Sequence, residues 1–318
     1  MGQFYSNGKL LLTGEYVVLD GATALAVPTK FGQDLIVDRI QGDQLIWSSF
    51  TVEGICWFEA VFDLPRIRLA NATFTSDHES SHELIAEILQ GLLQEAQRLN
   101  PNFLGSDQGF RVKTHLQFSL GWGLGSSSTL INNIAQWARV DAFSLLWNAF
   151  SGSGYDIACA RNDMPVFYTM NDRKPKIDTA YFDPPFKEQL YFVHLNQKQN
   201  SRDGIRRYQE RRSSSHSSFA AYILRISNIS QEMVKTDSLS DFEKLIAEHE
   251  AMIASMIGLP RIKDVFFADY ASEIKSLGAW GGDFVLATGD SSTPEYFRQK
   301  GFDTILTYAE MVLGYDGS

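Results

Sequence analysis

The sequence predicts a two-domain protein that combines helices with strands. At 318 residues, the chain exceeds the length at which a single hydrophobic core usually stops growing. Segments 34–40, 55–63 and 110–118 carry the apolar, β-branched or alternating residues typical of strands. Other segments space their apolar residues along one helical face, and the composition, 44% hydrophobic and 21% charged, supplies material for sizeable cores.

The N-terminal part begins with strands and then changes its period. Residues 9–20 are apolar and β-branched around one glycine, which predicts a strand interrupted by a tight turn. From residue 80 a capping box, Ser80-x-x-Glu83, predicts the start of a helix. The apolar residues that follow fall on one face of this helix: Ile85, Ile88, Leu89, Leu92, Ala96 and Leu99. Residues 110–118 alternate, so we expect a strand with one buried face.

A polar stretch with three prolines at 171–188 is the best candidate for a domain boundary. We therefore expect an N-terminal domain over 1–180 and a C-terminal domain over 181–318. The C-terminal domain is predicted to contain a strand at 189–195, helices at 216–234 and 241–257, the second opened by a capping box at Ser240, and a strand at 283–288 after a glycine-rich turn at 278–282.

The bulk properties exclude several classes of protein. A formal net charge of −10 argues against broad nucleic-acid binding, which needs clustered Lys and Arg. Cys56 and Cys159 lack metal-ligand spacing, so neither a disulfide framework nor a structural zinc site is expected. The N-terminus shows no signal-peptide pattern, and no apolar run is long enough to span a membrane. We expect a cytoplasmic protein without a membrane partner.

A glycine- and serine-rich stretch, Gly-Trp-Gly-Leu-Gly-Ser-Ser-Ser at 121–128, lies between a predicted strand and a predicted helix at 129–138. Glycines let the backbone approach an anion, and a helix N-terminus favours phosphate. A Walker A loop would need a lysine after Gly125, and a dinucleotide fingerprint would need glycine at Ser128. Asp141 keeps a dehydrogenase open, and a loop that binds nothing is a further alternative.

Four segments together resemble the GHMP kinase superfamily. Residues 7–16 (Asn-Gly-Lys-Leu-Leu-Leu-Thr-Gly-Glu-Tyr) are similar to its opening motif, and 123–128 is similar to its Gly-Leu-Gly-Ser-Ser-Ala loop. Residues 152–158 (Gly-Ser-Gly-Tyr-Asp-Ile-Ala) occur where the family places its catalytic aspartate, and 275–283 (Lys-Ser-Leu-Gly-Ala-Trp-Gly-Gly-Asp) is similar to its third motif. The matches appear in family order over nearly the whole chain. The Gly-Ser-Gly-Tyr-Asp form looks most like the mevalonate-pathway branch.

The resemblance implies an α+β architecture with a ribosomal-protein-like βαβ domain and a C-terminal ferredoxin-like domain. It also implies an ATP- and Mg²⁺-dependent kinase of the mevalonate pathway that acts on phosphomevalonate or mevalonate, with a diphosphomevalonate decarboxylase-like enzyme or a degenerate ATP-binding protein as alternatives. Expected partners are a small anionic substrate and no nucleic acid, with a homodimer left open.

The resemblance also assigns roles to individual residues. Asp156 would accept or orient the proton of the attacking group, and Lys9 would stabilise charge on the transferring phosphoryl. Ser127 would bind Mg²⁺. The remaining ATP-binding residues would be Gly123, Leu124, Gly125, Ser126, Ser128 and Gly281, and the substrate would contact Ser153 and Gly154. Two alternatives stay open: Asp156 as the cap of a helix beginning at Ile157, and Lys9 as a surface lysine.

Some positions depart from the family pattern, and others allow two interpretations. Leu145 occurs where mevalonate kinase carries a magnesium-binding glutamate, and Trp280 replaces a glycine of the third motif. Glu15 either supports the strand that carries Lys9 or contacts the substrate. The basic stretch from Lys198 to Arg212 is either a solvated helix face or an anion clamp, and Lys198 and Arg202 are the clamp candidates.

Overall fold

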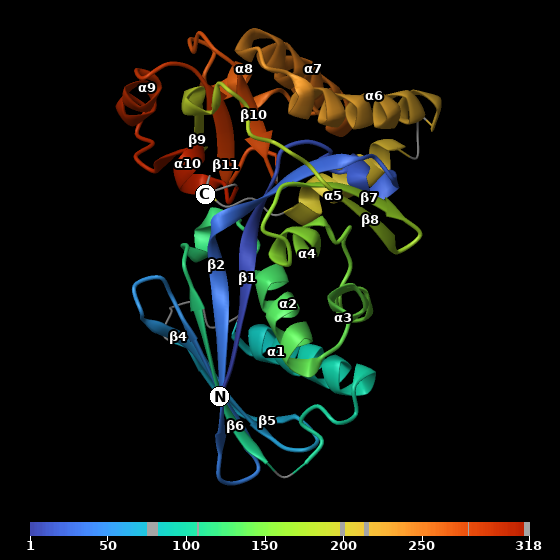
Figure 1. Ribbon diagram of the computed structural model, residues 1–318, viewed down its shortest axis with the longest axis vertical. Helices are drawn as coiled ribbons and strands as arrows, with labels where there is room; N and C mark the ends of the chain where they lie inside the picture. The colour runs from blue at the N-terminus through green and yellow to red at the C-terminus, as the bar shows by residue number, and fades with distance from the viewer. Residues whose placement is uncertain (75–81, 107, 198–200, 213–215, 279, 315–318) are drawn as a thin grey trace. The chain divides into compact units, whose positions relative to one another are not determined.

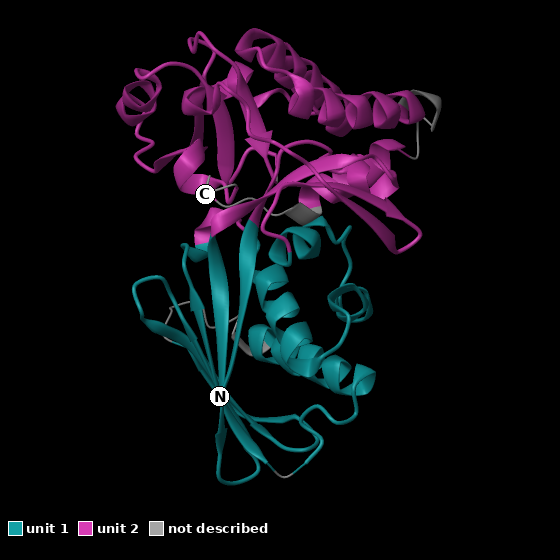
Figure 2. Ribbon diagram, in the orientation of Figure 1, with its two compact units in different colours: residues 1–8, 31–120, 125–161 teal, residues 9–30, 121–124, 162–318 magenta. Residues whose placement is uncertain are grey.

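The computed structural model describes residues 1–74, 82–106, 108–197, 201–212, 216–278 and 280–314 (Figure 1). The chain divides into two compact units (Figure 2). Unit 1 comprises residues 1–8, 31–120 and 125–161, and unit 2 comprises residues 9–30, 121–124 and 162–318. Each unit is thus made of several segments of the chain. The expected division into two continuous domains, 1–180 and 181–318, stays a prediction. In the described parts of the chain, no helix is both long and apolar enough to cross a membrane.

Unit 1 contains most of a large sheet. The strands of this sheet that lie wholly or partly in unit 1 are β1 (Gly2–Leu11), β2 (Ala24–Ile40), β3 (Gln44–Phe50), β4 (Cys56–Asp63), β5 (Arg68–Phe74) and β6 (Gly109–Leu116). Residues 9–11 of β1 and 24–30 of β2 belong to unit 2. The strand order is β5-β4-β3-β6-β2, with β1 also paired to β2. Of the pairs β5–β4, β4–β3, β3–β6 and β6–β2, only β3–β6 is parallel. In β6 the side chains of Val112, Thr114 and Leu116 are buried while Arg111 and Lys113 are exposed, which confirms the predicted alternation.

The helices of unit 1 gather on one side of these strands (Figure 1). They are α1 (His82–Leu99), α2 (Ser126–Ala138), α3 (Ala142–Ala149) and α4 (Tyr155–Ala160). The helices expected over 85–99 and 129–138 are confirmed, whereas the capping box at Ser80 and Glu83 lies outside the described side chains. The Asp141 carboxylate caps α3 by accepting the Ser144 N–H at 2.8 Å. This local role accounts for an acid at that position.

A hairpin in unit 2 occupies part of the polar stretch that the prolines had marked as a boundary. Strands β7 (Val166–Asn171) and β8 (Lys174–Thr179) pair antiparallel, and β7 also pairs with the Ala24–Ala26 segment of β2. Asp172 and Arg173 form the turn with φ values of 45° and 57°. Such left-handed residues match the twist of a tight hairpin. The polar composition therefore reflects an exposed hairpin strand.

The rest of unit 2 is built on a second, antiparallel sheet. Its strands β9 (Leu190–His194), β10 (Ile274–Leu277), β11 (Phe284–Thr288) and β12 (Ile305–Thr307) lie in the order β10-β11-β9-β12. Helices lie between β9 and β10 and again between β11 and β12, which gives the β-α-β-β-α-β pattern of a ferredoxin-like fold. The predicted strands at 189–195 and 283–288 are confirmed.

The helices of unit 2 are α5 (Ser201–Arg212), α6 (His216–Lys235), α7 (Leu239–Ile257), α8 (Ile262–Phe266), α9 (Thr293–Gln299) and α10 (Tyr308–Met311). The two long helices expected here, α6 and α7, are confirmed. The predicted capping box at Ser240 is wrong, because α7 begins two residues earlier. Ser238 is its N-cap, and the Ser238 hydroxyl accepts the Asp241 N–H at 3.3 Å.

Candidate active site

The glycine loop leads into helix α2 as the sequence predicts. Gly123 and Gly125 have φ values of 66° and 90°, which favour glycine, and Gly125 is the N-cap of α2 without a side-chain cap. The Ser128 hydroxyl donates to the Gly125 carbonyl at 2.8 Å, whereas the Ser127 side chain is exposed. The first turn of this 13-residue helix therefore presents backbone N–H groups and one exposed hydroxyl, an arrangement suited to phosphate.

Neutral side chains fix α2 on the strands of unit 1. The Ser6 hydroxyl donates to Asn133 Oδ1 at 2.7 Å, and Asn133 Nδ2 donates to the Gln33 carbonyl at 2.9 Å. Thr129 Oγ1 donates to Gln33 Oε1 at 2.7 Å, and Asn132 Nδ2 donates to Ser6 Oγ at 2.9 Å. All of these residues are buried. Sequence reasoning missed this anchor, because polar residues in a helix give no signal of the strand they contact.

Asp156 lies in the first turn of α4, and α4 packs against α2 within unit 1. Gly154, with φ 89°, is the N-cap of this helix, so the alternative that Asp156 is the cap is wrong. The Asp156 side chain is half-buried and makes no hydrogen bond or ion pair within the described residues. Its carboxylate is therefore available to a ligand, while Ser153 and Gly154 are buried beside it in the sequence.

Lys9 and the first half of the loop lie in unit 2. Lys9 is only 9% exposed, so the alternative of a surface lysine is wrong. Its Nζ donates to the Gly123 carbonyl at 3.0 Å, and its backbone N–H donates to the Leu124 carbonyl at 2.9 Å. Lys9 belongs to unit 2 and Asp156 to unit 1. Their joint action stays a prediction.

Asp283 lies beside the glycine loop, and the sequence had given this residue no role. A Cβ at Gly123 would lie 2.3 Å from Asp283 Oδ2, so the carboxyl group of Asp283 occupies the space beside this glycine. Asp283 follows the glycine-rich turn and has φ 50°. The signal was present in the third motif, which ends on this aspartate, but the sequence did not show that the motif folds back onto the loop.

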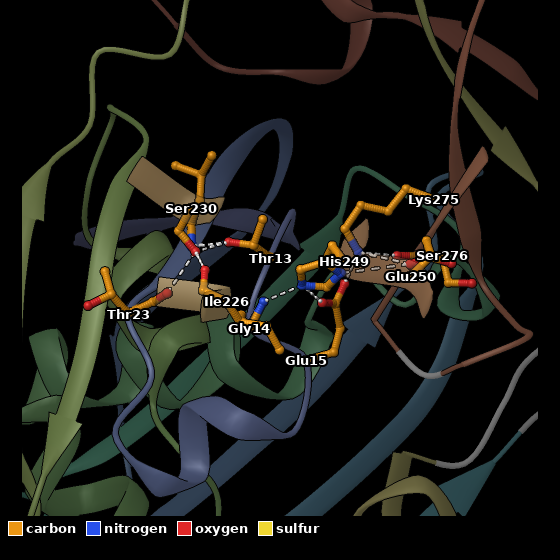
Figure 3. A network of polar contacts seen from close by, with 11 residues as sticks. Thr13, Gly14, Glu15, Thr23, Ile226, Ser230, His249, Glu250, Lys275 and Ser276 are labelled. Carbon is orange, nitrogen blue, oxygen red and sulfur yellow. Dashed lines mark hydrogen bonds and ion pairs between the residues drawn. The ribbon is translucent and has the colours of Figure 1, made fainter. Parts of the chain in front are cut away.

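Glu15 belongs to a buried ion-pair network in unit 2 (Figure 3). Lys275 Nζ donates to Glu15 Oε1 at 2.6 Å and to Glu250 Oε1 at 3.3 Å. The Gly14 N–H donates to His249 Nε2 at 3.1 Å. Burial raises the pKa of the Glu15 carboxyl, against the opposing effect of Lys275. This placement supports the interpretation that Glu15 holds the segment after Lys9, and its contact with substrate stays a prediction.

Trp280 is buried and fixed at both ends. Its backbone N–H donates to the Tyr16 hydroxyl at 3.2 Å, and its Nε1 donates to the Pro260 carbonyl at 2.9 Å. Burial raises the pKa of Tyr16 to about 12, so this hydroxyl stays protonated at neutral pH. Trp280 therefore joins the third motif to the first. Gly281, the predicted ATP contact, follows it with φ 85°.

The sequence departs from the resemblance most clearly at the metal. Leu145 is fully buried in α3, so no acid replaces the family glutamate at that position. Within the described residues, no group of three or more His, Cys, Asp or Glu side chains could hold a metal ion. The exposed Ser127 hydroxyl and the Asp156 carboxylate are oxygen donors that fit Mg²⁺, which usually keeps several waters and uses substrate phosphates as ligands.

The basic residues of α5 are mostly engaged in local contacts. Arg206 pairs with Asp203 at 3.2 Å, and Arg212 pairs with Asp20 at 2.9 Å. Arg211 donates to the Ser255 carbonyl at 3.2 Å. These contacts support the solvated helix face for this part of the stretch. The two clamp candidates, Lys198 and the Arg202 side chain, lie outside what the structure describes, so their roles stay predictions.

Solved structures of GHMP kinases share the fold of this chain. The mevalonate kinase of Methanococcus jannaschii matches with a TM-score of 0.69 and 13% identity, over 99% of this chain and 98% of that one. A galactokinase of Lactococcus lactis matches with a TM-score of 0.68 and 14% identity, over 98% and 93%. The phosphomevalonate kinase of Streptococcus pneumoniae, in complex with phosphomevalonate and AMPPNP, matches with a TM-score of 0.64 and 15% identity, over 99% of both chains.

No protein-family model matches the sequence, and no curated protein does. The structural matches cover nearly the whole of each chain, so the predicted α+β GHMP kinase fold is confirmed. At this level of identity the likeness concerns the fold.

Proposed function

We propose that this protein is an ATP- and Mg²⁺-dependent kinase of a small anionic metabolite. The observation that carries the proposal is the N-terminus of α2, which follows two left-handed glycines and has no side-chain cap. The Asp156 carboxylate, unpaired among the described residues, lies on α4, the helix packed against α2. The backbone of 123–126 would bind the triphosphate, and Ser127 would hold the metal. Bound MgATP would supply the phosphoryl group and the charge that neutralises its oxygens.

The protein side of the reaction follows from these positions. Asp156 would accept the proton of the attacking hydroxyl or phosphate, a role that suits a carboxylate with no hydrogen-bond or ion-pair partner in the described part of the chain. The Lys9 ammonium, held at the Gly123 carbonyl, would stabilise negative charge on the phosphoryl oxygens. Positioning and charge neutralisation are what phosphoryl transfer chiefly requires.

For the substrate we propose phosphomevalonate ahead of mevalonate. The Gly-Ser-Gly-Tyr-Asp form of residues 152–156 supports this choice, as does the fold shared with kinases of both compounds. The test is an ADP-release assay over mevalonate, phosphomevalonate, homoserine and sugars, followed by mass measurement of the product. Release of ADP with one mevalonate compound and a product heavier by one phosphoryl group is the expected result. A decarboxylase-like activity would instead give a product that has lost carbon dioxide.

A second candidate is an ATP-binding protein with degenerate activity. The buried Leu145 and the buried Trp280 favour it, because they remove an expected acid and fill a glycine position. ATP binding without ADP release on any compound of the same set would support this candidate. Binding of NAD without protection by ATP would support the dehydrogenase alternative.

A further inference from the structure

Unit 2 buries four ionisable side chains in one place. Glu15 lies in the segment after β1, His249 and Glu250 lie on α7, and Lys275 lies on β10 (Figure 3). Their exposed fractions lie between 0% and 2%. We call these residues the buried charge cluster. Buried charges cost free energy unless they are paired, so such a group calls for an explanation beyond stability.

Lys275 is the only cation of the cluster, and its ammonium group makes three hydrogen bonds. Its Nζ donates to Glu15 Oε1 at 2.6 Å, to Glu250 Oε1 at 3.3 Å and to the Ser276 carbonyl at 2.9 Å. The other carboxyl oxygens, Glu15 Oε2 and Glu250 Oε2, are buried and make no hydrogen bond among the described residues, although Glu15 Oε2 lies 3.3 Å from His249 Nε2. The ammonium group therefore serves both carboxyl groups but satisfies one oxygen of each.

His249 adds no positive charge. Its Nε2 accepts the Gly14 N–H at 3.1 Å, so a neutral ring carries its proton on Nδ1. Protonation of Nε2 would turn this acceptor into a donor and break the contact. Burial, followed by the nearby Lys275 charge, holds the pKa of His249 well below 6.5.

The cluster therefore contains two carboxyl groups against one positive charge. If both carboxyl groups ionised, one negative charge would stay unbalanced inside the protein. A single proton on either carboxyl group removes the imbalance, as in other carboxylate pairs that share a site. Burial raises the pKa of Glu250 to about 7, against the opposing effect of Lys275.

The arginines of α5 and α6 that reach α7 in the described residues do not supply the missing charge. The segment after β1 contributes Glu15 and Tyr16, and both carboxyl groups of the cluster raise the pKa of that hydroxyl. From α6, Arg225 pairs with Glu248 on the exposed side of α7 at 2.6 Å. From α5, Arg211 donates to the Ser255 carbonyl of α7. The two arginines that reach α7 in these contacts are therefore engaged elsewhere.

The cluster joins two segments of the candidate site. Gly14 and Glu15 follow β1, which carries Lys9 and ends at Leu11. Lys275 precedes the glycine-rich turn and Asp283 follows it, and the carboxyl group of Asp283 lies beside Gly123. The cluster therefore links the segment after Lys9 to the strand that leads to Asp283.

We propose that the buried charge cluster is a proton-controlled clamp, in which one proton held on its carboxyl groups keeps residues 13–16 against β10 and favours nucleotide binding at the phosphate loop. Loss of the proton leaves Glu15 and Glu250 competing as anions for Lys275, which loosens this segment. Glu250 and His249 are then positioning residues that never touch the nucleotide. The nucleotide part of the proposal rests on the proposed function.

The test compares the wild type with Glu250→Gln, which keeps an acceptor for Lys275 and cannot ionise. Glu248→Gln, an exposed neighbour on the same helix, is the matched control. A carboxyl group whose pKa is higher in the folded state stabilises the protein fully at acidic pH, and this contribution is lost as pH rises through about 7. From pH 5 to pH 8, the Tm of Glu250→Gln relative to wild type should therefore rise by roughly 5 °C.

The second measurement is ATP affinity by calorimetry over the same pH range. From pH 6 to pH 8, the ATP affinity of the wild type should fall about fivefold more than that of Glu250→Gln. A factor of about five is at the lower end of the coupling usually found between linked binding sites. If the Tm of Glu250→Gln relative to wild type does not change with pH, as expected for Glu248→Gln, the claim that the cluster titrates in this pH range is overturned. If the Tm difference rises with pH but the ATP affinities of the wild type and Glu250→Gln change equally with pH, the clamp is overturned and the cluster has only a structural role.

A wild-type measurement keeps the proposal testable if Glu250→Gln does not fold. Infrared difference spectra between pH 6 and pH 8 should show loss of a protonated-carboxyl C=O band at neutral pH, and absence of that band would overturn the proposal. The Tm and infrared measurements need no substrate. A protein that binds no ATP would therefore refute the proposed function while the cluster could still be judged.

Discussion

The two units hold their parts of the candidate site by opposite chemical means. In unit 1, α2 is fixed by neutral amides and hydroxyls, such as Asn133 and Ser6, that satisfy one another. In unit 2, the segment after Lys9 is fixed by buried charges whose acceptors outnumber their donors. A neutral anchor does not respond to pH, whereas an unbalanced charged one must. Among the described residues, the Asp156 carboxylate of unit 1 has no partner and can act on a ligand, whereas Glu15 of unit 2 is paired with Lys275.

The largest expected effect is on turnover, and it comes from changing Asp156, the carboxylate proposed to act as the base. Asp156→Asn should lower kcat by about 10²–10⁴-fold, the usual contribution of a general base. Because the Asp156 side chain makes no hydrogen bond or ion pair with the described residues that the change would remove, Tm should stay within error. Asp178→Asn, an exposed aspartate of β8, is the control. Near-wild-type turnover of Asp156→Asn on the true substrate would show that this carboxylate is not the base.

Removing the single cation of the buried charge cluster should give the largest loss of stability. Lys275→Met leaves two buried carboxyl groups without their cation, and breaking a buried ion pair in this way costs about 3–5 kcal/mol. Denaturant unfolding at pH 7.5 measures the loss. Lys244→Met, which removes an exposed lysine paired with Asp241, should cost less than about 0.5 kcal/mol. Equal losses for the two variants would refute the importance of the buried charge.

The neutral anchor should cost less to break and should be indifferent to pH. Asn133→Ala leaves the Gln33 carbonyl and the Ser6 hydroxyl without this partner, at a cost of about 1–3 kcal/mol. None of these groups titrates near neutrality, so the loss should be the same at pH 5.5 and pH 8. A loss that varied with pH would contradict the comparison between the units.

The sequence predicted the elements that its own periodicity encodes. Strand β6 alternates along its length, and α1, α6 and α7 repeat apolar residues at helical spacing, so local pattern and final structure agree. Strands β3, β5 and β10 were not predicted, since each depends on partners distant in the chain. The hairpin of β7 and β8 was missed because Pro175 and polar residues resemble a linker.

The candidate site was predictable only where a motif is continuous. The loop at 123–128, Lys9 and Asp156 were found from such motifs, although their roles stay predictions. His249 and Glu250 were not found, because nothing in their helix distinguishes buried charges from a solvated face. Asp283 was visible in a motif, but its place beside Gly123 depends on a fold-back that joins residues 160 positions apart.

The smallest effect concerns His249, whose pH dependence has the opposite sign to that of Glu250. Because burial depresses the pKa of His249, its contribution to stability is present above 6.5 and is lost as pH falls. His249→Gln keeps an acceptor for the Gly14 N–H but cannot take up a proton. Relative to wild type, the variant should gain up to about 1.4 kcal/mol in unfolding free energy for each pH unit below 6.5. Denaturant unfolding at pH 5.5, 6.5 and 7.5 measures this gain, and a constant difference across these values would show that His249 is not neutral in the folded protein.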